Sequence, residues 1–579
     1  SGGVIQRTFT YDTLGRLVSS SDPDLGTHQF AWDDGDRLTR EQNGTSQTVE
    51  YRYDQLGRLM TRDSSGFIAQ LHYDAPRIGA PANQSGRLAW IAEPTGELDV
   101  GYDELGNQVS STRSIDGHSA SVSATYATSG LVLQRTFDDG LALTYQYDPA
   151  GRATGIGSYW QALALDANGS SLDERAGNGA ETVYHRDILG QVDRMTLRNG
   201  AATTVYDVAA TRDPANRLTR LTDTDGKGLD HSATFTYDGF SRLVGSTLGS
   251  GADLFSFTYQ YDVLHNMTGR TQVGPRVLNL FAGTYRYGEG GHGPRQLTSI
   301  VDSANHVTHT FGYDLAGREV AHDGISLDYD ASDRLVSVAG LAGGAETHTY
   351  GVDGTREKTI AADGTIAYYF GDAGVERLGA REHDIVVNGR VVARVSVSLA
   401  AAPASSKTAG VVAVGGFGLA ALLGLALALA RPRRRAPRWA HASAFVLMFG
   451  CASTEGSREQ ELVGAATVTY MHTAYGAGPT LYSDSSGNVI EERRYEPFGV
   501  VVDAANVALL DVSELGKRVD LATGWSDHGA RWLAPETARW LSTDPPVTGP
   551  DAKFMAEPWA LHPYQYVDQN PVAFWDPDG

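Results

Sequence analysis

The chain has 579 residues, a formal net charge of −22 and 67 glycines, a glycine content above the usual share of about 7%. Hydrophobic residues make up 41% of the chain, which is enough to bury a core and excludes wholesale disorder. The acidic balance disfavours a general nucleic-acid binder, because phosphates require a basic face, and the single cysteine excludes a disulfide scaffold and a cysteine-based zinc site. Abundant glycine and 27 tyrosines, with few helical patterns, predict an all-β chain.

Residues 1–399 carry a repeated motif. The stretches Tyr11–Leu17, Trp32–Leu38 and Tyr53–Leu59 start 21 residues apart, and each has an aromatic-Asp pair, a glycine, an arginine and a leucine in the same order. Repetition at a fixed spacing is typical of stacked structural units. Degenerate copies begin at Tyr73, Tyr102, Tyr147, Tyr237, Tyr261, Tyr313 and Tyr329.

Each copy has the pattern of a β-hairpin. Phe9 and Tyr11 alternate with polar residues and so share one face of a strand. An Asp-x-x-Gly turn follows, in which the aspartate caps backbone N–H groups and the glycine adopts a positive φ. A hairpin of about 20 residues cannot bury its own face, so we expect the hairpins to stack into one long sheet. The alternative is a set of unrelated hairpins in an ordinary sandwich.

These Tyr-Asp, Gly and Arg repeats resemble the YD-repeat, or Rhs-repeat, family, which includes bacterial Rhs proteins, the C subunits of insecticidal Tc toxins and the shells of teneurins. The resemblance implies a strip of β-hairpins that spirals into a large hollow shell over residues 1–399. Because residues 1–3 lie directly before a repeat, we expect the chain to be a fragment whose N-terminal part is missing.

Residues 400–460 differ sharply in composition. Residues 409–430 contain no charged or polar side chain and are long enough to span a bilayer as a helix, and five arginines follow between residues 431 and 438. This pattern predicts a membrane span whose basic end stays cytoplasmic. The alternative is a glycine- and alanine-rich segment buried in the shell. Basic and apolar residues before Cys451 also resemble an internal lipoprotein signal, which would make Cys451 a site of acylation. The alternative is that Cys451 is an inert, buried thiol.

Residues 461–579 resemble the Rhs repeat-associated core domain, through Arg494–Gly499, Gly529–Trp532, Pro535–Pro545, His562–Val567 and Asn570–Gly579 in that order. In that family the core plugs one end of the shell, and many members cut their own chain just after an Asp-Pro-x-Gly motif. The resemblance assigns this chemistry to Asp544, Asp576 and Arg539.

Two neighbouring carboxylates cannot both ionise easily, so one of them can act as a general acid and the other as a general base on a peptide bond. A nearby arginine can stabilise an oxyanion. The structural alternative is that both aspartates only form turns and caps.

The sequence therefore predicts a bacterial shell that carries a C-terminal toxin cargo beyond Gly579, possesses no cofactor or metal site, and releases the cargo by aspartate-dependent self-cleavage. We expect the shell itself not to bind nucleic acid, and expect a secreted or envelope-associated location, with a secretion apparatus or a target-cell surface as partner. A second hypothesis is a membrane-anchored, teneurin-like interaction protein without cleavage. A third is a degenerate remnant with neither activity.

Overall fold

The structure is a computed structural model, and it describes residues 5–75, 77, 83–224, 228–399, 466–473, 479–504, 511–513, 515–548 and 561–579. Forty strands form one antiparallel sheet in which each strand pairs with the next along the chain, and three further strands form a small second sheet. The all-β prediction is confirmed, and so is the prediction of one long sheet built from consecutive hairpins.

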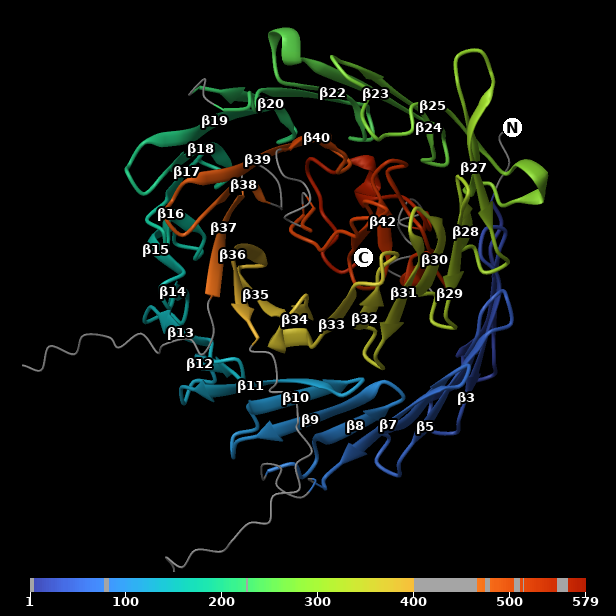
Figure 1. Ribbon diagram of the computed structural model, residues 1–579. Coiled ribbons are helices and arrows are strands. Elements are labelled where there is room, and N and C mark those ends of the chain that lie inside the picture. Colours follow the sequence, from blue (N-terminus) through green and yellow to red (C-terminus); the bar gives the residue numbers. More distant parts are fainter. Residues whose placement is uncertain are drawn as a thin grey trace, which may run out of the picture. The chain divides into compact units, whose positions relative to one another are not determined.

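The strip has a first winding, β1–β25, and a second winding, β26–β40 (Figure 1). The first consists of β1 (Thr8–Tyr11), β2 (Leu17–Asp22), β3 (Gly26–Trp32), β4 (Leu38–Gln42), β5 (Thr48–Tyr53), β6 (Leu59–Ser64), β7 (Phe67–Tyr73), β8 (Leu88–Glu93), β9 (Gly96–Tyr102), β10 (Gln108–Ile115), β11 (His118–Tyr126), β12 (Val132–Phe137), β13 (Ala142–Tyr147), β14 (Ala153–Ile156), β15 (Trp160–Leu165), β16 (Ser171–Ala176), β17 (Glu181–Arg186), β18 (Val192–Arg198), β19 (Thr204–Arg212), β20 (Leu218–Asp223), β21 (Ala233–Tyr237), β22 (Leu243–Leu248), β23 (Phe255–Tyr261), β24 (Met267–Val273) and β25 (Gly283–Tyr287).

The second winding consists of β26 (Leu297–Val301), β27 (Val307–Tyr313), β28 (Glu319–His322), β29 (Ile325–Tyr329), β30 (Leu335–Leu341), β31 (Gly344–Tyr350), β32 (Arg356–Ile360), β33 (Ile366–Tyr369), β34 (Val375–Arg377), β35 (Ala380–Val387), β36 (Arg390–Ser398), β37 (Ala466–Thr473), β38 (Pro479–Ser483), β39 (Val489–Tyr495) and β40 (Val501–Ala504). The small sheet contains β41 (Ser526–Asp527), β42 (Trp532–Ala534) and β43 (Arg539–Trp540). Within the described residues, helical structure is limited to α1 (Pro545–Thr548) and 3₁₀ turns at Gly251–Asp253, Glu289–Gly291, Gly371–Ala373 and Val567–Gln569.

The aspartate and arginine of each repeat close the hairpin turn together. In the turn between β1 and β2, Asp12 Oδ1 accepts the backbone N–H groups of Leu14 and Arg16, both at 2.9 Å. Gly15 has a φ of +83°, which explains the glycine of the motif. The guanidinium of Arg16 donates to the other carboxylate oxygen at 2.7 Å. The expected capping role of the aspartate is confirmed, and the arginine proves to be its ion-pair partner.

The same arginine also connects one repeat to the next. Arg37 donates to the carbonyl oxygen of Asp54 in the following turn, at 3.1 Å, and its guanidinium lies over the ring of Tyr53, 5.1 Å from the centroid. The Tyr53 hydroxyl in turn donates to the carbonyl oxygen of Leu38, at 2.8 Å. Charge-assisted hydrogen bonds and cation–π contacts of this kind favour a fixed spacing between neighbouring hairpins. The recurrence of tyrosine, aspartate and arginine is thus explained by contacts between repeats.

The second winding packs against the first along a seam. Asp22, the last residue of β2, and Asp24 in the turn that follows bind Arg295, with the closest contacts at 2.9 and 2.5 Å. Farther along, Arg113 of β10 contacts Glu357 of β32 at 2.7 Å. These partners lie more than 240 residues apart in the chain. Because each contact pairs a basic with an acidic side chain away from water, the seam selects one alignment of the two windings.

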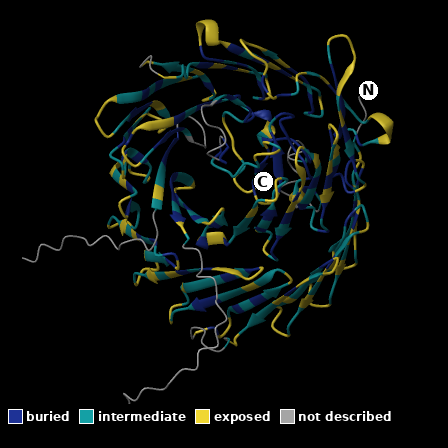
Figure 2. Cartoon of the chain, in the orientation of Figure 1, coloured by how far each residue is buried: buried dark blue, intermediate teal, exposed yellow. Residues whose placement is uncertain are grey.

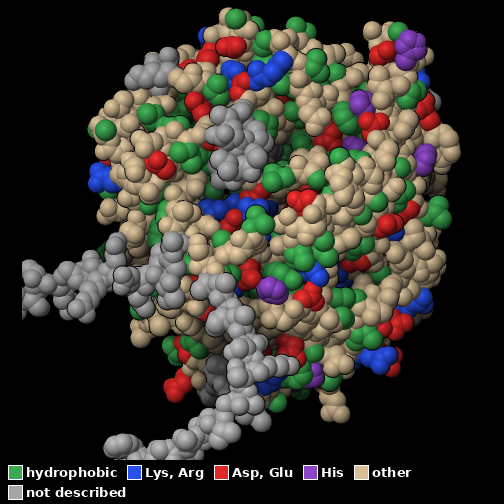
Figure 3. Space-filling view, viewed as in Figure 1, with side chains coloured by type: hydrophobic (Ala, Val, Ile, Leu, Met, Phe, Trp, Pro, Cys, Tyr) green, Lys and Arg blue, Asp and Glu red, His purple; other side chains and the backbone are tan. Residues whose placement is uncertain are grey.

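Further pairs continue along this seam: His383 with Asp139 at 2.6 Å, Arg390 with Glu174 at 3.0 Å, and His231 with Glu492 at 2.6 Å. On the face shown in Figure 3, acidic and basic side chains are likewise interspersed. The spiral predicted from the repeats is therefore observed, and it is held by charge pairs as well as by apolar packing.

Residues 400–465 lie outside the described residues, but the strands on both sides are paired with each other. β36 and β37 are antiparallel neighbours, with Val397 opposite Ala466 and Ala393 opposite Tyr470. The chain therefore leaves and rejoins the sheet at one place, and the 400–465 segment is an insertion into a hairpin. The predicted membrane span at 409–430, the arginine block and Cys451 all fall in this insertion, so they stay predictions. No helix in the described ranges is long and apolar enough to cross a membrane.

The C-terminal segment lies inside the curve of the strip (Figure 1), and its apolar residues share a hydrophobic core with those of the strip. Phe257, Leu297 and Phe498 of the strip pack in one apolar cluster with Trp540 and Tyr564 of this segment. Buried residues are concentrated at this contact, whereas exposed residues gather at hairpin tips (Figure 2). The strip itself continues to Ala504 before the small sheet begins. The residues after the strip, 515–548 and 561–579, thus pack on its concave face as the plug and belong to the same compact unit as the strip, so the predicted division into a shell at 1–399 and a core domain at 461–579 stays a prediction.

Candidate functional site

The candidate site lies where the small sheet meets the last residues of the chain. The turn before β42 begins with the His528 N–H donating to the Arg531 carbonyl at 3.0 Å. The Ala530 N–H donates to the carbonyl oxygen of Asp578 at 3.0 Å, so the turn also binds the Asp-Pro-x-Gly segment. Backbone bonds thus place the end of the chain against the Gly-Ala-Arg motif.

Arg531 joins the two predicted aspartates. Its Nη2 atom lies 3.5 Å from Asp544 Oδ2 and 3.3 Å from Asp576 Oδ2. Its Nε atom donates to the carbonyl oxygen of Gly579 at 2.9 Å. The Arg531 side chain is only 3% exposed, whereas the two carboxylates keep partial access to solvent. One guanidinium therefore contacts both carboxylates and the carbonyl group of the glycine that ends the Asp-Pro-x-Gly sequence.

Gly579, the glycine of the Asp-Pro-x-Gly motif, lies in a space too small for any side chain. Gly579 has a φ of +85°, and a Cβ atom there would lie 2.9 Å from the backbone nitrogen of Arg531 and 3.1 Å from Cβ of His528. Its N–H donates to Asp576 Oδ1 at 3.0 Å, which closes the tetrapeptide turn. A glycine is required here by conformation and by space together.

Burial raises the pKa of Asp544. Desolvation is the main cause; the Arg531 charge opposes it, and the neighbouring Asp576 carboxylate adds to it. Desolvation also lowers the pKa of the Arg531 guanidinium. The arrangement gives one carboxyl group an increased tendency to hold a proton beside a second carboxylate, as the sequence reasoning about paired aspartates requires.

Arg539 lies elsewhere. It is fully buried, its Nη2 donates to the carbonyl oxygen of Arg295 at 2.7 Å, and its guanidinium lies between the rings of Tyr287 and Tyr564, at 5.3 and 5.0 Å. The structure thus brings together Asp544 and Asp576 of the predicted set and replaces Arg539 with Arg531 at their side. The sequence contains both arginines in an Ala-Arg-Trp context, one directly before β42 and one in β43, and no local signal separates them.

Buried polar contacts hold the plug against the strip. Arg270 of β24 donates to the carbonyl oxygens of Pro535 and Glu536 at 2.9 Å, and the same guanidinium pairs with Glu496 of the strip at 2.6 Å, with neither side chain exposed. His322 of β28 contacts Glu319 at 2.5 Å and Glu536 at 3.0 Å, and these carboxylates raise its pKa to about 10 against the opposing effect of burial. Breaking such buried contacts would cost several kcal/mol of free energy, on the order of 3–5 kcal/mol for one pair, so they hold in place the plug that carries the site.

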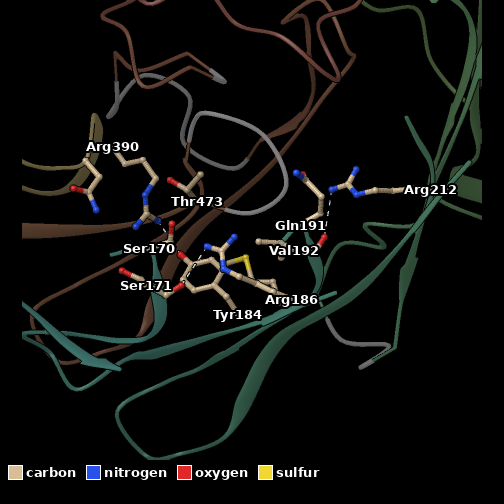
Figure 4. A pocket seen from close by; sticks show the side chains of 11 residues that line it. Ser170, Ser171, Tyr184, Arg186, Gln191, Val192, Arg212, Arg390 and Thr473 are labelled. Carbon is tan, nitrogen blue, oxygen red and sulfur yellow. Dashed lines mark hydrogen bonds between the residues drawn. The ribbon is translucent and has the colours of Figure 1, made fainter. Parts of the chain in front are cut away.

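A separate cavity of about 360 Å³ lies at the seam between the two windings (Figure 4). Arg390, Arg186 and Arg212 line it together with Tyr184 and Thr473. Arg390 is already paired with Glu174 and with the Tyr184 hydroxyl. The cavity contains none of the residues around Asp544 and Asp576. Within the described residues, no group of three His, Cys, Asp or Glu side chains has the arrangement of a metal site.

Comparisons with known proteins bear on the fold. No family profile matches the chain. The double-stranded DNA deaminase toxin A of Burkholderia cenocepacia (strain H111) is 24% identical over 394 residues, which are 62% of this chain and 25% of that protein. The chain therefore spans about a quarter of this curated relative.

Solved structures of a Tc toxin resemble nearly the whole chain. TcdB2–TccC3 without its hypervariable C-terminal region aligns with a TM-score of 0.74 at 17% identity, covering 99% of this chain and 28% of that one. TcdB2–TccC3–Cdc42 gives 0.73 at 17% identity with the same coverage, and the Photorhabdus luminescens Tc holotoxin pore gives 0.73 at 18% identity, also covering 99% and 28%. The repeated hairpins and this likeness together identify the chain's fold as that of the YD-repeat shells of Tc toxins.

Proposed function

We propose that the chain is the shell and core of a toxin-carrying protein, and that Asp544, Asp576 and Arg531 cut the chain after Gly579. The observation that carries the cleavage proposal is the position of Arg531, which contacts both carboxylates and the Gly579 carbonyl oxygen. The carrier role is supported by the likeness to toxin shells and by the curated toxin relative.

Each group suits one part of peptide hydrolysis. The Arg531 Nε–H points at the Gly579 carbonyl oxygen and can stabilise the negative charge that develops there when water attacks the carbon. Asp576 lies against Arg531 and can accept the proton of the attacking water. Asp544, with its raised pKa, can donate a proton to the leaving nitrogen as the C–N bond breaks. Water supplies the hydroxyl group and the balancing proton, so no cofactor is needed.

The test is a fusion that extends the chain past Gly579 with a small folded reporter domain. We expect the wild-type fusion to separate at this point, measured by denaturing electrophoresis and intact mass. Asp576→Asn and Asp544→Asn should abolish the reaction because each removes one of the two carboxylates. A single uncut species from the wild-type fusion would refute the cleavage proposal.

A matched pair of variants distinguishes the two arginines. Arg531→Lys keeps the charge but cannot bridge two carboxylates and a carbonyl oxygen at once, so cleavage should fall on the order of 100-fold or more. Arg539→Lys changes a guanidinium that touches none of these groups, and cleavage should stay close to the wild-type rate wherever the protein folds, as checked by circular dichroism. The reverse ranking would return the assignment to Arg539.

The carrier role has its own readout. If the shell retains its cargo, the released reporter should co-elute with the shell in gel filtration under native conditions. It should separate only when the shell is unfolded. Delivery partners, such as a secretion apparatus or a target-cell surface, belong to this proposal as expectations from the toxin relatives.

A further inference from the structure

One more side chain binds the Asp-Pro-x-Gly turn. His528 Nδ1 lies 2.8 Å from the carbonyl oxygen of Asp576. A carbonyl oxygen can only accept, so Nδ1 carries the hydrogen. The other ring nitrogen, Nε2, lies 3.1 Å from Ser526 Oγ and therefore accepts the serine hydroxyl hydrogen. The two contacts together define a single tautomer of the imidazole.

The surroundings hold this ring in place. His528 is 3% exposed, and its ring meets the Trp540 ring edge-on, with centroids 5.0 Å apart. Burial lowers the pKa of His528 to about 4, so the imidazole is neutral near neutral pH. A neutral ring fixed by Ser526 on one side presents a permanent Nδ1–H donor on the other.

This donor acts on the first residue of the turn that contains the proposed scissile carbonyl. Asp576 provides both the carbonyl that accepts from His528 and the carboxylate that contacts Arg531. At the other end of the turn, Gly579 lies close to the His528 side chain, since a Cβ atom added to the glycine would lie 3.1 Å from His528 Cβ. His528 therefore lies beside both ends of the tetrapeptide.

We propose that His528 is a positioning residue, which holds the Asp576–Gly579 turn so that the Asp576 carboxylate and the Gly579 carbonyl both meet Arg531. The proposal rests on the proposed cleavage for its effect on rate, but the ordering of the turn is independent of any reaction. The proposal assigns no proton transfer to His528: its Nδ1–H donates to the Asp576 carbonyl, and its Nε2 accepts from Ser526.

The experiment compares His528→Asn with His528→Gln in the reporter fusion. The Asn amide nitrogen occupies the place of Nδ1 and can still donate to Asp576, whereas the Gln amide reaches the place of Nε2. Both variants lose the ring and its packing on Trp540, so their thermal unfolding midpoints should fall alike. Cleavage should remain near the wild-type rate in the Asn variant and fall on the order of 100-fold in the Gln variant, because small misplacements of reacting groups are costly.

Amide hydrogen exchange in residues 570–579 gives a readout that needs no cleavage. Exchange should quicken in the Gln variant and stay slow in the Asn variant. If the wild-type fusion is not cut but this contrast appears, the cleavage proposal fails and the positioning role stands. Equal exchange in the two variants would overturn the role of His528, and so would equal cleavage rates where the wild-type fusion is cut.

Discussion

The turn Asp12–Arg16 of the first winding and the turn Asp314–Arg318 of the second share their local structure but differ in their surroundings. In each, the aspartate Oδ1 accepts two backbone N–H groups, and the other oxygen accepts from the arginine at 2.7 Å. The Arg16 side chain is 21% exposed, whereas the Arg318 side chain is 4% exposed. Arg318 also donates to Gln47 Oε1 of the first winding at 2.8 Å.

The comparison shows that one motif serves two purposes. A free turn needs the aspartate and arginine only to close its own hairpin and to reach the next one. A turn in the seam uses the same arginine to bind another winding, far away in sequence. The loss of unfolding free energy on replacing a motif residue should therefore depend on whether its turn is buried in the seam, although the local geometry of the turns is the same.

The largest contrast is expected for arginine removal. Arg318→Ala leaves the Asp314 and Asp333 carboxylates in the seam without their shared partner, and should lower the free energy of unfolding by about 3–5 kcal/mol. Arg16→Ala removes an exposed ion pair and should leave the unfolding midpoint close to wild type. Denaturant unfolding of the two variants measures this; equal effects would show that the seam does not depend on Arg318.

Glycine replacement tests the space around the same two turns. Gly15→Ala and Gly317→Ala carry the same backbone strain, because φ is +83° and +81°. A Cβ at residue 317 would also lie 2.5 Å from the Asp24 carbonyl oxygen, whereas no heavy atom lies within 4 Å of one at residue 15. We expect Gly317→Ala to cost about 1–3 kcal/mol more than Gly15→Ala, by the same unfolding measurement. Equal losses of stability in the two variants would mean that the backbone at Asp24 can move away from residue 317 without a free-energy penalty.

A third contrast concerns pH at the seam. Burial, with Glu93 nearby, raises the pKa of Glu357 to about 7, although Arg113 opposes the shift. The pKa of this carboxyl group is near 4.5 in the unfolded chain and higher in the folded protein, so the protonated group favours the folded state. This stabilisation is fully present below pH 4.5 and is lost as the pH rises through 7. Wild type should therefore lose up to about 3 kcal/mol of stability over this range, relative to Glu357→Gln.

Thermal unfolding from pH 5 to pH 8 measures this difference, with Glu104→Gln in an exposed turn as control. The control should follow the wild-type pH profile, because Glu104 lies outside the seam. A Glu357→Gln variant with an unchanged profile would contradict the shifted pKa of this carboxyl group.

Much of the fold followed from the repeats. The alternation around Tyr11, the Asp-x-x-Gly turn and the spacing of 21 residues predict hairpins, and the structure contains them. The arginine of the motif carries no obvious role in the sequence, because its partners in the next repeat become visible only when the hairpins are stacked. The insertion at 400–465 appears in the sequence as a change of composition, while the pairing of β36 with β37 shows that its two ends meet.

The candidate site was predicted only in part. Asp544 and Asp576 were found through the resemblance, and the structure brings them to one guanidinium. The choice between Arg531 and Arg539 depends on which side of a three-stranded sheet faces the end of the chain. In the structure Arg531 packs on the ring of Trp540, and Arg270 of the distant β24 binds the carbonyl oxygens of Pro535 and Glu536 between the two strands, contacts that residues next to the arginines do not reveal.

The sequence by itself determined the hairpin unit, since strand alternation and turn chemistry act over fewer than ten residues. Only the tertiary structure decided which turns are buried in the seam and which arginine meets the aspartates. The physical reason is distance along the chain: the seam partners lie more than 270 residues apart, and Asp576 and Gly579 lie 45 and 48 residues from Arg531, so these groups meet only when the chain has folded.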